Sequence, residues 1–275
     1  MNEIRLICLD MDGTLLDDDH ATVPQRNLRA LRTAAERGVD IAIASGRAWD
    51  LLREINAQLG VVRYGVLSNG AAVLDAKTGE WLYRKSIPEE PRRRAVSLLL
   101  EWGIPFEVYC DGENYIQRDR KQETVSRALS QAFRHILETR SHFPEDLNRA
   151  LDGKAVEKIH LFHVPEERRT DLLNRLEEFG SFAVTSSFGQ NMELTALGVN
   201  KCTAVQALCA RLGLGPEQVM AFGDAGNDLE LLAWANWSFA MGNATDEAKQ
   251  TARFLTGTNH EAGVGMAVEQ YVLNL

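Results

Sequence analysis

The sequence lacks the features that mark disulfide-rich, secreted and membrane-spanning proteins. Its 275 residues include four cysteines, and no two of them form a Cys-x-x-Cys pair. We therefore expect free thiols in a reducing compartment. No apolar run approaches the roughly 20 residues of a membrane-spanning helix, and the first apolar segment begins too early to leave room for a signal peptide. These absences favour a cytoplasmic protein with no membrane partner.

The sequence also has few basic residues relative to acidic ones. Acidic residues outnumber basic ones, and the net charge is -9 at pH 7. Because nucleic-acid binding depends on clustered Lys and Arg that neutralise phosphates, we expect no nucleic-acid partner. A phosphorylated ligand would need a local cation for the same reason. The 45% hydrophobic and 25% charged composition, without repeats or low-complexity tracts, is typical of a soluble globular protein.

Two aspartates follow the first apolar run of the chain. Residues 6–9, Leu-Ile-Cys-Leu, predict a strand buried on both faces at the centre of a parallel sheet. Asp10 and Asp12 come next, and side chains two apart in an extended chain point the same way. Both can then face one pocket at the carboxyl end of the strand, where open α/β sheets bind ligands.

Two ionised carboxylates about 5 Å apart would repel each other by roughly 3 kcal/mol at an effective dielectric constant near 20. A bound cation or a shared proton relieves this repulsion. The pair therefore suggests two roles, a metal ligand and nucleophile beside a proton donor. Gly13 allows a tight turn after the pair, and Thr14 offers a hydroxyl and an N–H to an anion. An ordinary acidic surface turn is the alternative, and the full Asp-x-Asp-Gly-Thr run disfavours it.

Polar residues also end the next two predicted strands. Ser45-Gly46-Arg47 follows the strand predicted at 39–44 and precedes a predicted helix at 49–59. A hydroxyl beside the free N–H groups of a helix start can seat a phosphate, although Ser is also an ordinary helix cap. We expect Arg47 to contact the substrate. Asn69-Gly70 predicts a hairpin turn, and Asn69 either serves only the turn or also reaches the ligand.

A lysine and two further aspartates lie in the last third of the chain. Asn200 is a natural helix N-cap and places Lys201 in the first helical turn, where the helix dipole disfavours a cation. A phosphate held at the helix start would explain that lysine. Gly223-Asp224-Ala225-Gly226-Asn227-Asp228 follows another buried strand, at 218–222. Local turn chemistry could account for this run, but as a second acidic strand end it predicts the other half of a magnesium site.

The middle of the chain changes character. Strands and helices alternate up to about residue 85, and Pro88 and Pro91 then mark a boundary. Helices predicted at 89–102, 121–139 and 166–179, with strands among them, indicate an inserted α+β module, after which the core resumes near residues 191–195. His160 and His163 lie three apart in a predicted strand and so point to opposite faces, which favours structural roles over a zinc site.

Together, the four motifs resemble those of the haloacid dehalogenase superfamily of phosphatases. The Gly-Val-Asn-Lys run at 198–201, the Gly-Asp-x-x-Asn-Asp run at 223–228 and the Gly-Val-Gly run at 263–265 are similar to its Cof-type branch, whose members carry a large inserted α/β cap. Cys202 stands where that branch often has glycine, and Ser45 replaces the commoner threonine. These departures keep the functional groups and bear mainly on substrate preference.

The resemblance implies an α/β fold with a Rossmann-like, three-layer parallel-sheet core at 1–85 and 190–275. It also implies an inserted α+β cap domain at 86–189 that selects the substrate. Asp10 would attack phosphorus to form an aspartyl-phosphate, and Asp12 would serve as general acid and base. Mg²⁺ would be held by Asp10, Asp224, the Asp12 backbone carbonyl and Asp228, the last directly or through water. The groups expected to hold the phosphate are Thr14, Ser45, Gly46, Lys201 and Asn227.

The implied function is hydrolysis of phosphomonoesters of small metabolites, with phosphosugars or phosphorylated cofactors as the expected substrates. A phosphotransferase or sugar-phosphate mutase could use the same core and differ only in what accepts the phosphoryl group. A receiver-like regulatory domain also places acidic strand ends, a hydroxyl and a lysine around magnesium. Such a domain has no use for Asp12 as an acid or for an insertion of this size.

Overall fold

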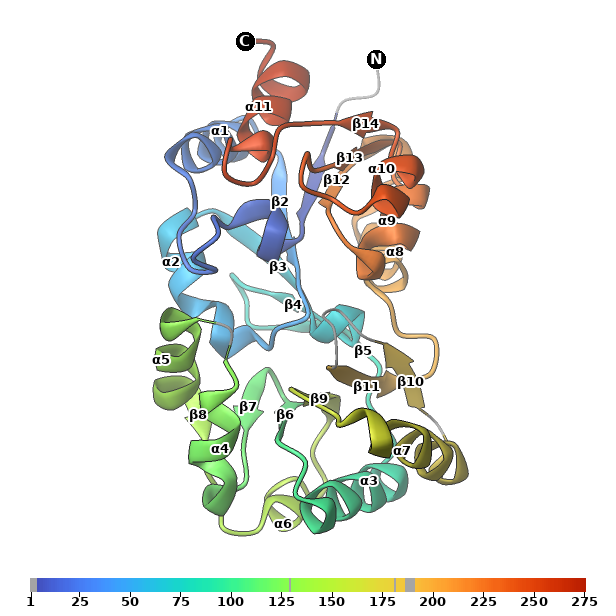
Figure 1. Cartoon of the computed structure of the whole chain (residues 1–275). Helices are drawn as coiled ribbons and strands as arrows, with labels where there is room; N and C mark the ends of the chain where they lie inside the picture. Colours follow the sequence, from blue (N-terminus) through green and yellow to red (C-terminus); the bar gives the residue numbers. More distant parts are fainter. Residues whose placement is uncertain (1–3, 129, 181, 186–190) are drawn as a thin grey trace. The chain divides into compact units, whose positions relative to one another are not determined.

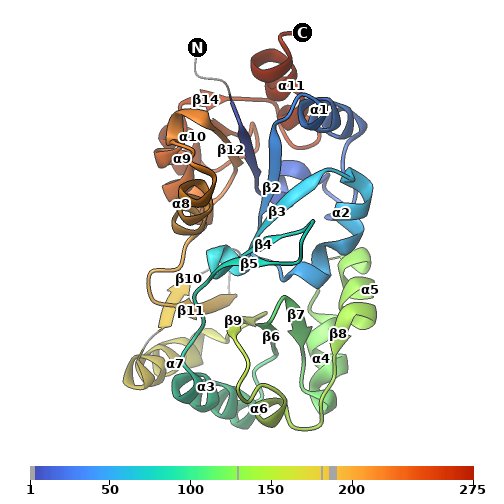
Figure 2. The same cartoon turned by 180° about the vertical axis from the view of Figure 1, so that it is seen from behind.

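The structure is a computed structural model that describes residues 4–128, 130–180, 182–185 and 191–275 (Figures 1 and 2). The chain divides into two compact units. We call Met1–Gly46, Leu52–Tyr83 and Asn200–Leu275 the core unit, and Arg47–Leu51 with Arg84–Val199 the insert unit. No helix in the described part of the chain is long and apolar enough to cross a membrane.

The core unit is built on an eight-stranded sheet with the order β14-β13-β12-β1-β2-β3-β4-β5. The strands from β14 to β3 run parallel, and β4 returns antiparallel to β3 through the predicted hairpin at Asn69-Gly70. All four residues of β1 are buried, as expected of a central strand. The strand bounds are β1 Leu6–Leu9, β2 Asp40–Ala44, β3 Val62–Leu67, β4 Ala72–Asp75, β5 Trp81–Arg84, β12 Val219–Gly223, β13 Trp237–Ala240 and β14 Phe254–Leu255.

Helices cover both faces of this sheet and make the three layers. One group comprises α1 (Gln25–Glu36), α2 (Arg53–Leu59) and α11 (Gly263–Val268), and Figure 1 shows it on one side of the sheet. On the other side lie α8 (Lys201–Leu212), α9 (Leu229–Trp234) and α10 (Asp246–Thr251). Apolar side chains of α8 and α9 pack on those of β1, β2 and β3 in a single buried cluster. The predicted α/β class and Rossmann-like core are confirmed.

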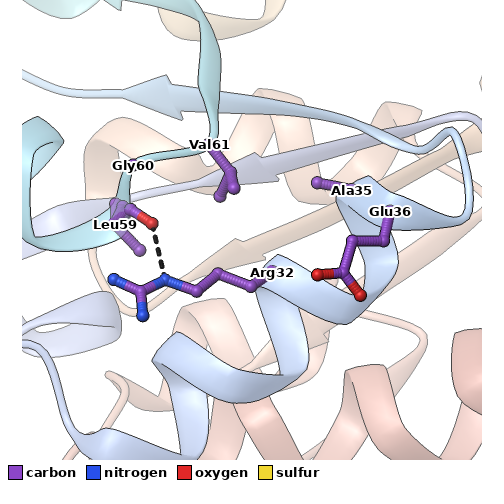
Figure 3. Close-up of a pocket in the computed structure, with 6 residues that line it drawn as sticks. All are labelled: Arg32, Ala35, Glu36, Leu59, Gly60 and Val61. Atoms are coloured by element: carbon purple, nitrogen blue, oxygen red, sulfur yellow. Dashed lines mark hydrogen bonds between the residues drawn. The ribbon is translucent and has the colours of Figure 1, made fainter.

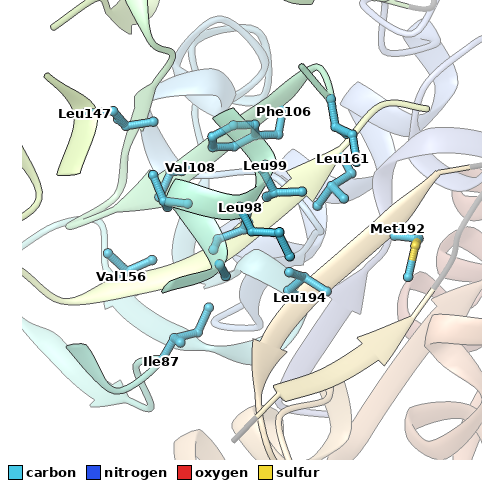
Figure 4. Packing of buried hydrophobic residues seen from close by; sticks show 14 of the residues in the cluster. Ile87, Leu98, Leu99, Phe106, Val108, Leu147, Val156, Leu161, Met192 and Leu194 are labelled. Carbon is cyan, nitrogen blue, oxygen red and sulfur yellow. The ribbon is translucent and has the colours of Figure 1, made fainter. Parts of the chain in front are cut away.

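The insert unit holds a six-stranded sheet with the order β10-β11-β9-β6-β7-β8. Its apolar face packs against three helices, whose buried leucines include Leu99, Leu147 and Leu172. Figure 4 shows Leu99 and Leu147 among the strand residues of this cluster. The strands are β6 Phe106–Cys110, β7 Glu113–Tyr115, β8 Ser141–His142, β9 Val156–Leu161, β10 Phe182–Thr185 and β11 Met192–Ala196. The helices are α3 Glu89–Trp102, α4 Lys121–Ser126, α5 Gln131–Arg140, α6 Leu147–Ala150 and α7 Glu166–Phe179.

Three expectations about elements are corrected. The strand near 191–195 does not resume the core, because β11 pairs with β9 and β10 in the sheet of the insert unit. The helix expected at 121–139 is two helices, α4 and α5, and the Ser130 side chain caps the second by accepting from the N–H of Phe133. The helix expected at 49–59 begins as a tight turn at Trp49–Leu52, so that only α2 is α-helical. The sequence also predicts a strand at 182–187. The structure has β10 at Phe182–Thr185, and the last two residues of the prediction lie outside the described residues.

Candidate active site

Asp10 follows the last residue of β1, at the carboxyl end of the parallel strands. Only 8% of the residue is exposed. The chain does not stay extended after it, because Met11–Leu15 forms a compact turn in which Gly13 has a φ of +78°. The alternation that would aim Asp10 and Asp12 at one pocket therefore ends with the strand. The Asp12 side chain is 29% exposed and contacts His20.

Asp10 instead meets two aspartates from the turn that follows β12. Ligand atoms of Asp10, Asp224 and Asp228 all lie within 4.8 Å of one another. Lys201, fully buried in the first turn of α8, joins them, with its Nζ 2.5 Å from Asp10 Oδ1 and 2.7 Å from Asp228 Oδ1. Residues about 190 positions apart in the sequence thus form one ionic cluster, which we call the carboxylate cluster.

The surrounding backbone explains how these side chains are held. Asp228 Oδ2 accepts hydrogen bonds from the backbone N–H groups of Asp224 and Ala225, at 3.1 and 3.3 Å. The Thr14 hydroxyl donates to Asp224 Oδ1 at 3.0 Å. A side chain at Gly13 would place its Cβ 2.5 Å from Asp224 Oδ2, so the close approach of the two turns requires glycine there.

Lys201 owes its position to the start of α8. The Asn200 side chain accepts from the N–H of Thr203, and the Thr203 hydroxyl is 3.4 Å from the N–H of Asn200, which completes a capping box. The predicted N-cap at Asn200 is therefore confirmed. Because the cap fixes the first helical turn, Lys201 projects into the carboxylate cluster despite the unfavourable helix dipole.

The electrostatics of the cluster show too much negative charge for one lysine. Burial raises the pKa of Asp10 well above its ordinary value, and the charges of Asp228 and Asp224 add to the rise against the opposing effect of Lys201. Burial and the Asp228 charge raise the pKa of Asp224 to about 6. Burial opposes the charge of Lys201, but the Asp10 and Asp228 carboxylates outweigh it and raise the lysine pKa.

The donor set of the carboxylate cluster fits a divalent cation. Its three carboxylates offer hard oxygen ligands around one point, and Lys201 balances only one of their charges. A doubly charged ion would neutralise the remainder and relieve the repulsion that raises the pKa values of Asp10 and Asp224.

The remaining predicted site residues are not members of the carboxylate cluster. Ser45 is 2% exposed, and its carbonyl accepts from the N–H of Asn69 at 3.0 Å, while Gly46, the next residue, is partly exposed. Asn227 donates from its side-chain amide to Asn69 Oδ1 at 3.5 Å. Asn69 has a φ of +59°, as its turn role requires, and through Asn227 it also connects with the turn after β12. Arg47 belongs to the insert unit, where its guanidinium lies 4.6 Å from the ring centre of Phe133.

Two residues carry more contacts than the sequence suggested. His20 Nδ1 is 2.9 Å from Asp12 Oδ1. In the sequence, the three aspartates at residues 17–19 predict a polar turn beside His20 but give no sign of this contact. His160, expected to be structural, lies 2.9 Å from Glu107, whose carboxylate also accepts from Tyr109 and Asn114 within the insert unit.

A hollow of about 480 Å³ lies elsewhere in the core unit, between α1 and the end of α2. Figure 3 shows Arg32 crossing it to donate to the carbonyl of Leu59 at 3.0 Å. Its lining residues are Arg32, Ala35, Glu36, Leu59, Gly60 and Val61, and they include neither a predicted site residue nor a member of the carboxylate cluster. It is therefore not the site that the motifs define.

The fold and the carboxylate cluster define a Rossmann-like α/β protein with a candidate divalent-cation site at the carboxyl end of its parallel sheet. The chain belongs to the haloacid dehalogenase-like hydrolases, whose family model matches residues 7–268. Hydrolases of this superfamily generally use a divalent metal ion. Within the superfamily the protein is a Cof-type hydrolase, a phosphatase of phosphoric monoesters.

Named relatives agree with this assignment. The 5-amino-6-(5-phospho-D-ribitylamino)uracil phosphatase YcsE of Bacillus subtilis (strain 168) is 30% identical over 271 residues, which cover 98% of this chain and 97% of that protein. The HMP-PP phosphatase of Serratia proteamaculans (strain 568) is 31% identical over 247 residues, covering 89% and 86%. A solved haloacid dehalogenase-like hydrolase from Bacteroides thetaiotaomicron shares the fold with a TM-score of 0.84 at 24% identity, covering 98% and 99% of the two chains.

Proposed function

We propose that the protein is a Mg²⁺-dependent phosphatase of small phosphorylated metabolites that works through an aspartyl-phosphate on Asp10. The observation that carries the proposal is the position of Lys201, whose ammonium lies 2.5 Å from the carboxylate of Asp10. A phosphoryl group bonded to that carboxylate would lie beside the same ammonium. Lys201 can therefore stabilise charge on the phosphoryl oxygens as the bond to Asp10 forms.

The remaining roles follow the chemistry of the side chains. Asp10 is the nucleophile, and Asp12 gives a proton to the leaving oxygen and later takes one from the water that hydrolyses the aspartyl-phosphate. Ser45, Gly46 and Asn227 complete the phosphate seat. Thr14 donates to Asp224 and so orients a carboxylate of the cluster.

Asp10, Asp224, Asp228 and the backbone carbonyl of Asp12 would hold Mg²⁺, with Asp228 acting directly or through water. When bound, the ion would cancel charge on the nucleophile and on the phosphate. The three side chains are already within reach of one another, which supports this ligand set.

For the substrate, we propose phosphosugars or phosphorylated cofactors, in the cytoplasm and without a nucleic-acid partner. The relatives from Bacillus subtilis and Serratia proteamaculans are both named as phosphatases of particular metabolites. The compound in the name of the Bacillus subtilis relative carries its phosphate on a ribityl chain. A phosphorylated ribityl compound is therefore the first candidate to test. We propose that the insert unit is the cap that selects among such compounds.

The test is hydrolysis of 4-nitrophenyl phosphate with and without Mg²⁺. We expect turnover by the wild type that depends on Mg²⁺ and falls by about a thousandfold or more in Asp10→Asn, which removes the nucleophile. Asp246→Asn, an exposed aspartate of α10, is the matched control and should keep full activity. Activity in Asp10→Asn equal to that of the control would contradict the proposal. A stable phosphate on Asp10 without turnover would instead favour a phosphotransferase.

A further inference from the structure

His20 contacts the Asp12 carboxyl directly. Its Nδ1 lies 2.9 Å from Asp12 Oδ1, and the two side chains are 27% and 29% exposed. We infer that His20 is a positioning residue, which holds the Asp12 carboxyl in the orientation that proton transfer to the leaving group requires. The inference rests on the proposed function, because it assumes that Asp12 is the general acid.

The loop that carries His20 is closed by its own hydrogen bonds. The N–H of Asp17 donates to the carbonyl of Thr22 at 2.9 Å, and the N–H of His20 donates to the carbonyl of Asp17 at 3.0 Å. Inside the loop, Asp19 Oδ1 accepts from the N–H groups of Ala21 and Thr22, at 2.9 and 2.8 Å. His20 therefore sits on a short, locally fixed loop, as a residue that orients another side chain must.

The same loop is tied to a distant segment of the core unit. Asn259 donates from its amide to the carbonyl of Leu16 and to the carboxylate of Asp18, at 3.0 and 3.1 Å. His260 Nδ1 lies 2.9 Å from Asp17 Oδ1. Upstream, the Asn243 amide donates to the carbonyl of Gly13 at 2.7 Å. The chain on both sides of Leu15 is thus anchored, which fixes Asp12 and His20 relative to each other.

The backbone at His20 is constrained in a way that shapes the test. Its φ of +58° lies in the left-handed region, which few residues other than Gly, Asn, Asp and His adopt without strain. Asn keeps this conformation and offers an amide N–H in place of the Nδ1–H. Gly keeps the conformation and removes the donor. The two substitutions therefore separate the hydrogen bond from the backbone.

The chemical step makes the consequence specific. As Asp10 attacks phosphorus, the bond from phosphorus to the leaving oxygen breaks, and the Asp12 proton passes to that oxygen. The His20 contact at Oδ1 sets the direction in which the Asp12 carboxyl presents its proton. Water then attacks the aspartyl-phosphate, gives its proton back to Asp12 and releases inorganic phosphate and free Asp10. Poor leaving groups need the proton more than good ones do.

The experiment compares kcat/KM for phenyl phosphate and 4-nitrophenyl phosphate, two esters of similar size whose leaving groups differ in basicity. This constant reports the steps up to departure of the leaving group. In His20→Gly we expect a loss of about tenfold or more for phenyl phosphate and a change within about threefold for 4-nitrophenyl phosphate. His20→Asn should restore most of the lost activity. Ala21→Ser, a change at the next residue that keeps both the imidazole and the hydrogen-bonded loop, should match the wild type.

The outcomes separate this inference from the proposed function. An unchanged ratio of the two constants in His20→Gly, or a His20→Asn enzyme as impaired as the glycine variant, would overturn the role of His20. The ratio is unchanged both when neither ester is affected and when both lose equally, and equal losses would indicate general damage to the site. Failure of the proposed function would be recognised by different results. The wild type would show no turnover, or the Asp10→Asn variant would remain active.

Discussion

At the scale of single residues, the site is governed by an imbalance of charge. Three carboxylates converge, and Lys201 supplies one positive charge to them. Without a metal ion, folding must bury this excess, and the cost appears as raised pKa values at Asp10 and Asp224. The arrangement therefore suits cation binding better than it suits the stability of the metal-free protein.

Asp224→Asn tests this balance. The pKa of Asp224 is raised to about 6 in the folded protein, above its ordinary value of 3.8, so the folded state binds this proton more tightly than the unfolded state. The stability of the metal-free protein should fall as pH rises from about 4 to about 6, and the full penalty remains at pH 7. Removing the charge should then stabilise the metal-free protein at pH 7 by about 1–3 kcal/mol. Thermal unfolding without Mg²⁺ at pH 5 and pH 7 measures both effects.

The same variant should lose the response to metal. If the carboxylate cluster holds Mg²⁺ as proposed, the ion should raise the unfolding temperature of the wild type, because it would bind only the folded cluster. It should raise that of Asp224→Asn much less. Asp246→Asn should behave as the wild type does in both series. A metal-free Asp224→Asn protein that is less stable than the wild type at pH 7 would show that the Asp224 charge is well compensated and would contradict the prediction.

The residues of the cluster could be predicted because they follow regular elements. Asp10, Asp224 and Asp228 come after parallel strands that end at one edge of the sheet, and Lys201 follows a recognisable N-cap. The direction of the Asp12 side chain could not be predicted, since it depends on the turn at Met11–Leu15. The contact of His20 depends on the turn and on a loop anchored by residues more than 200 positions away.

At the scale of elements, β11 shows how a strand can be assigned to the wrong sheet. Its sequence, Met-Glu-Leu-Thr-Ala, alternates apolar and polar residues, which is typical of an antiparallel strand with one polar face. The core strand β12, Val-Met-Ala-Phe-Gly, has no such alternation. The alternation therefore distinguishes the two strands, whereas their order along the chain does not. Helix α3 was predicted with its observed bounds because proline and glycine frame it.

A buried ion pair accompanies β11 in the sheet of the insert unit. Lys158 Nζ lies 2.7 Å from Glu193 Oε1, and the side chains are 2% and 6% exposed. Glu193→Leu should destabilise the protein by about 3–5 kcal/mol, because it leaves the Lys158 ammonium buried without this carboxylate. Adding Lys158→Met should recover most of the loss. Urea unfolding of the two variants measures it, and a double variant no more stable than Glu193→Leu would refute the prediction.

At the scale of the whole molecule, the chain builds its units from discontinuous segments. The core unit takes residues from both ends, and the insert unit includes the short segment Arg47–Leu51 besides Arg84–Val199. Ala48 and Leu51 pack in the same apolar cluster as Ile116 and Val125. The alternation of strands and helices predicted the core fold, and proline residues marked the start of the insertion. Composition could not reveal that residues 47–51 pack with a segment so far along the chain.

This organisation defines a chimera that tests where substrate preference resides. Residues 84–199 and 47–51 would be replaced together by the matching segments of the relative from Bacillus subtilis. Positions 48 and 51 would then come from the same protein as the segment against which they pack. If the insert unit selects the substrate, the order of kcat/KM across a panel of phosphate esters should follow the donor of the insert. Turnover of 4-nitrophenyl phosphate should stay within about tenfold of the wild type and remain dependent on Asp10, because the carboxylate cluster is unchanged. A chimera that keeps the original order of preference would place specificity in the core unit. A second chimera that exchanges only residues 84–199 is the control for the packing of residues 47–51.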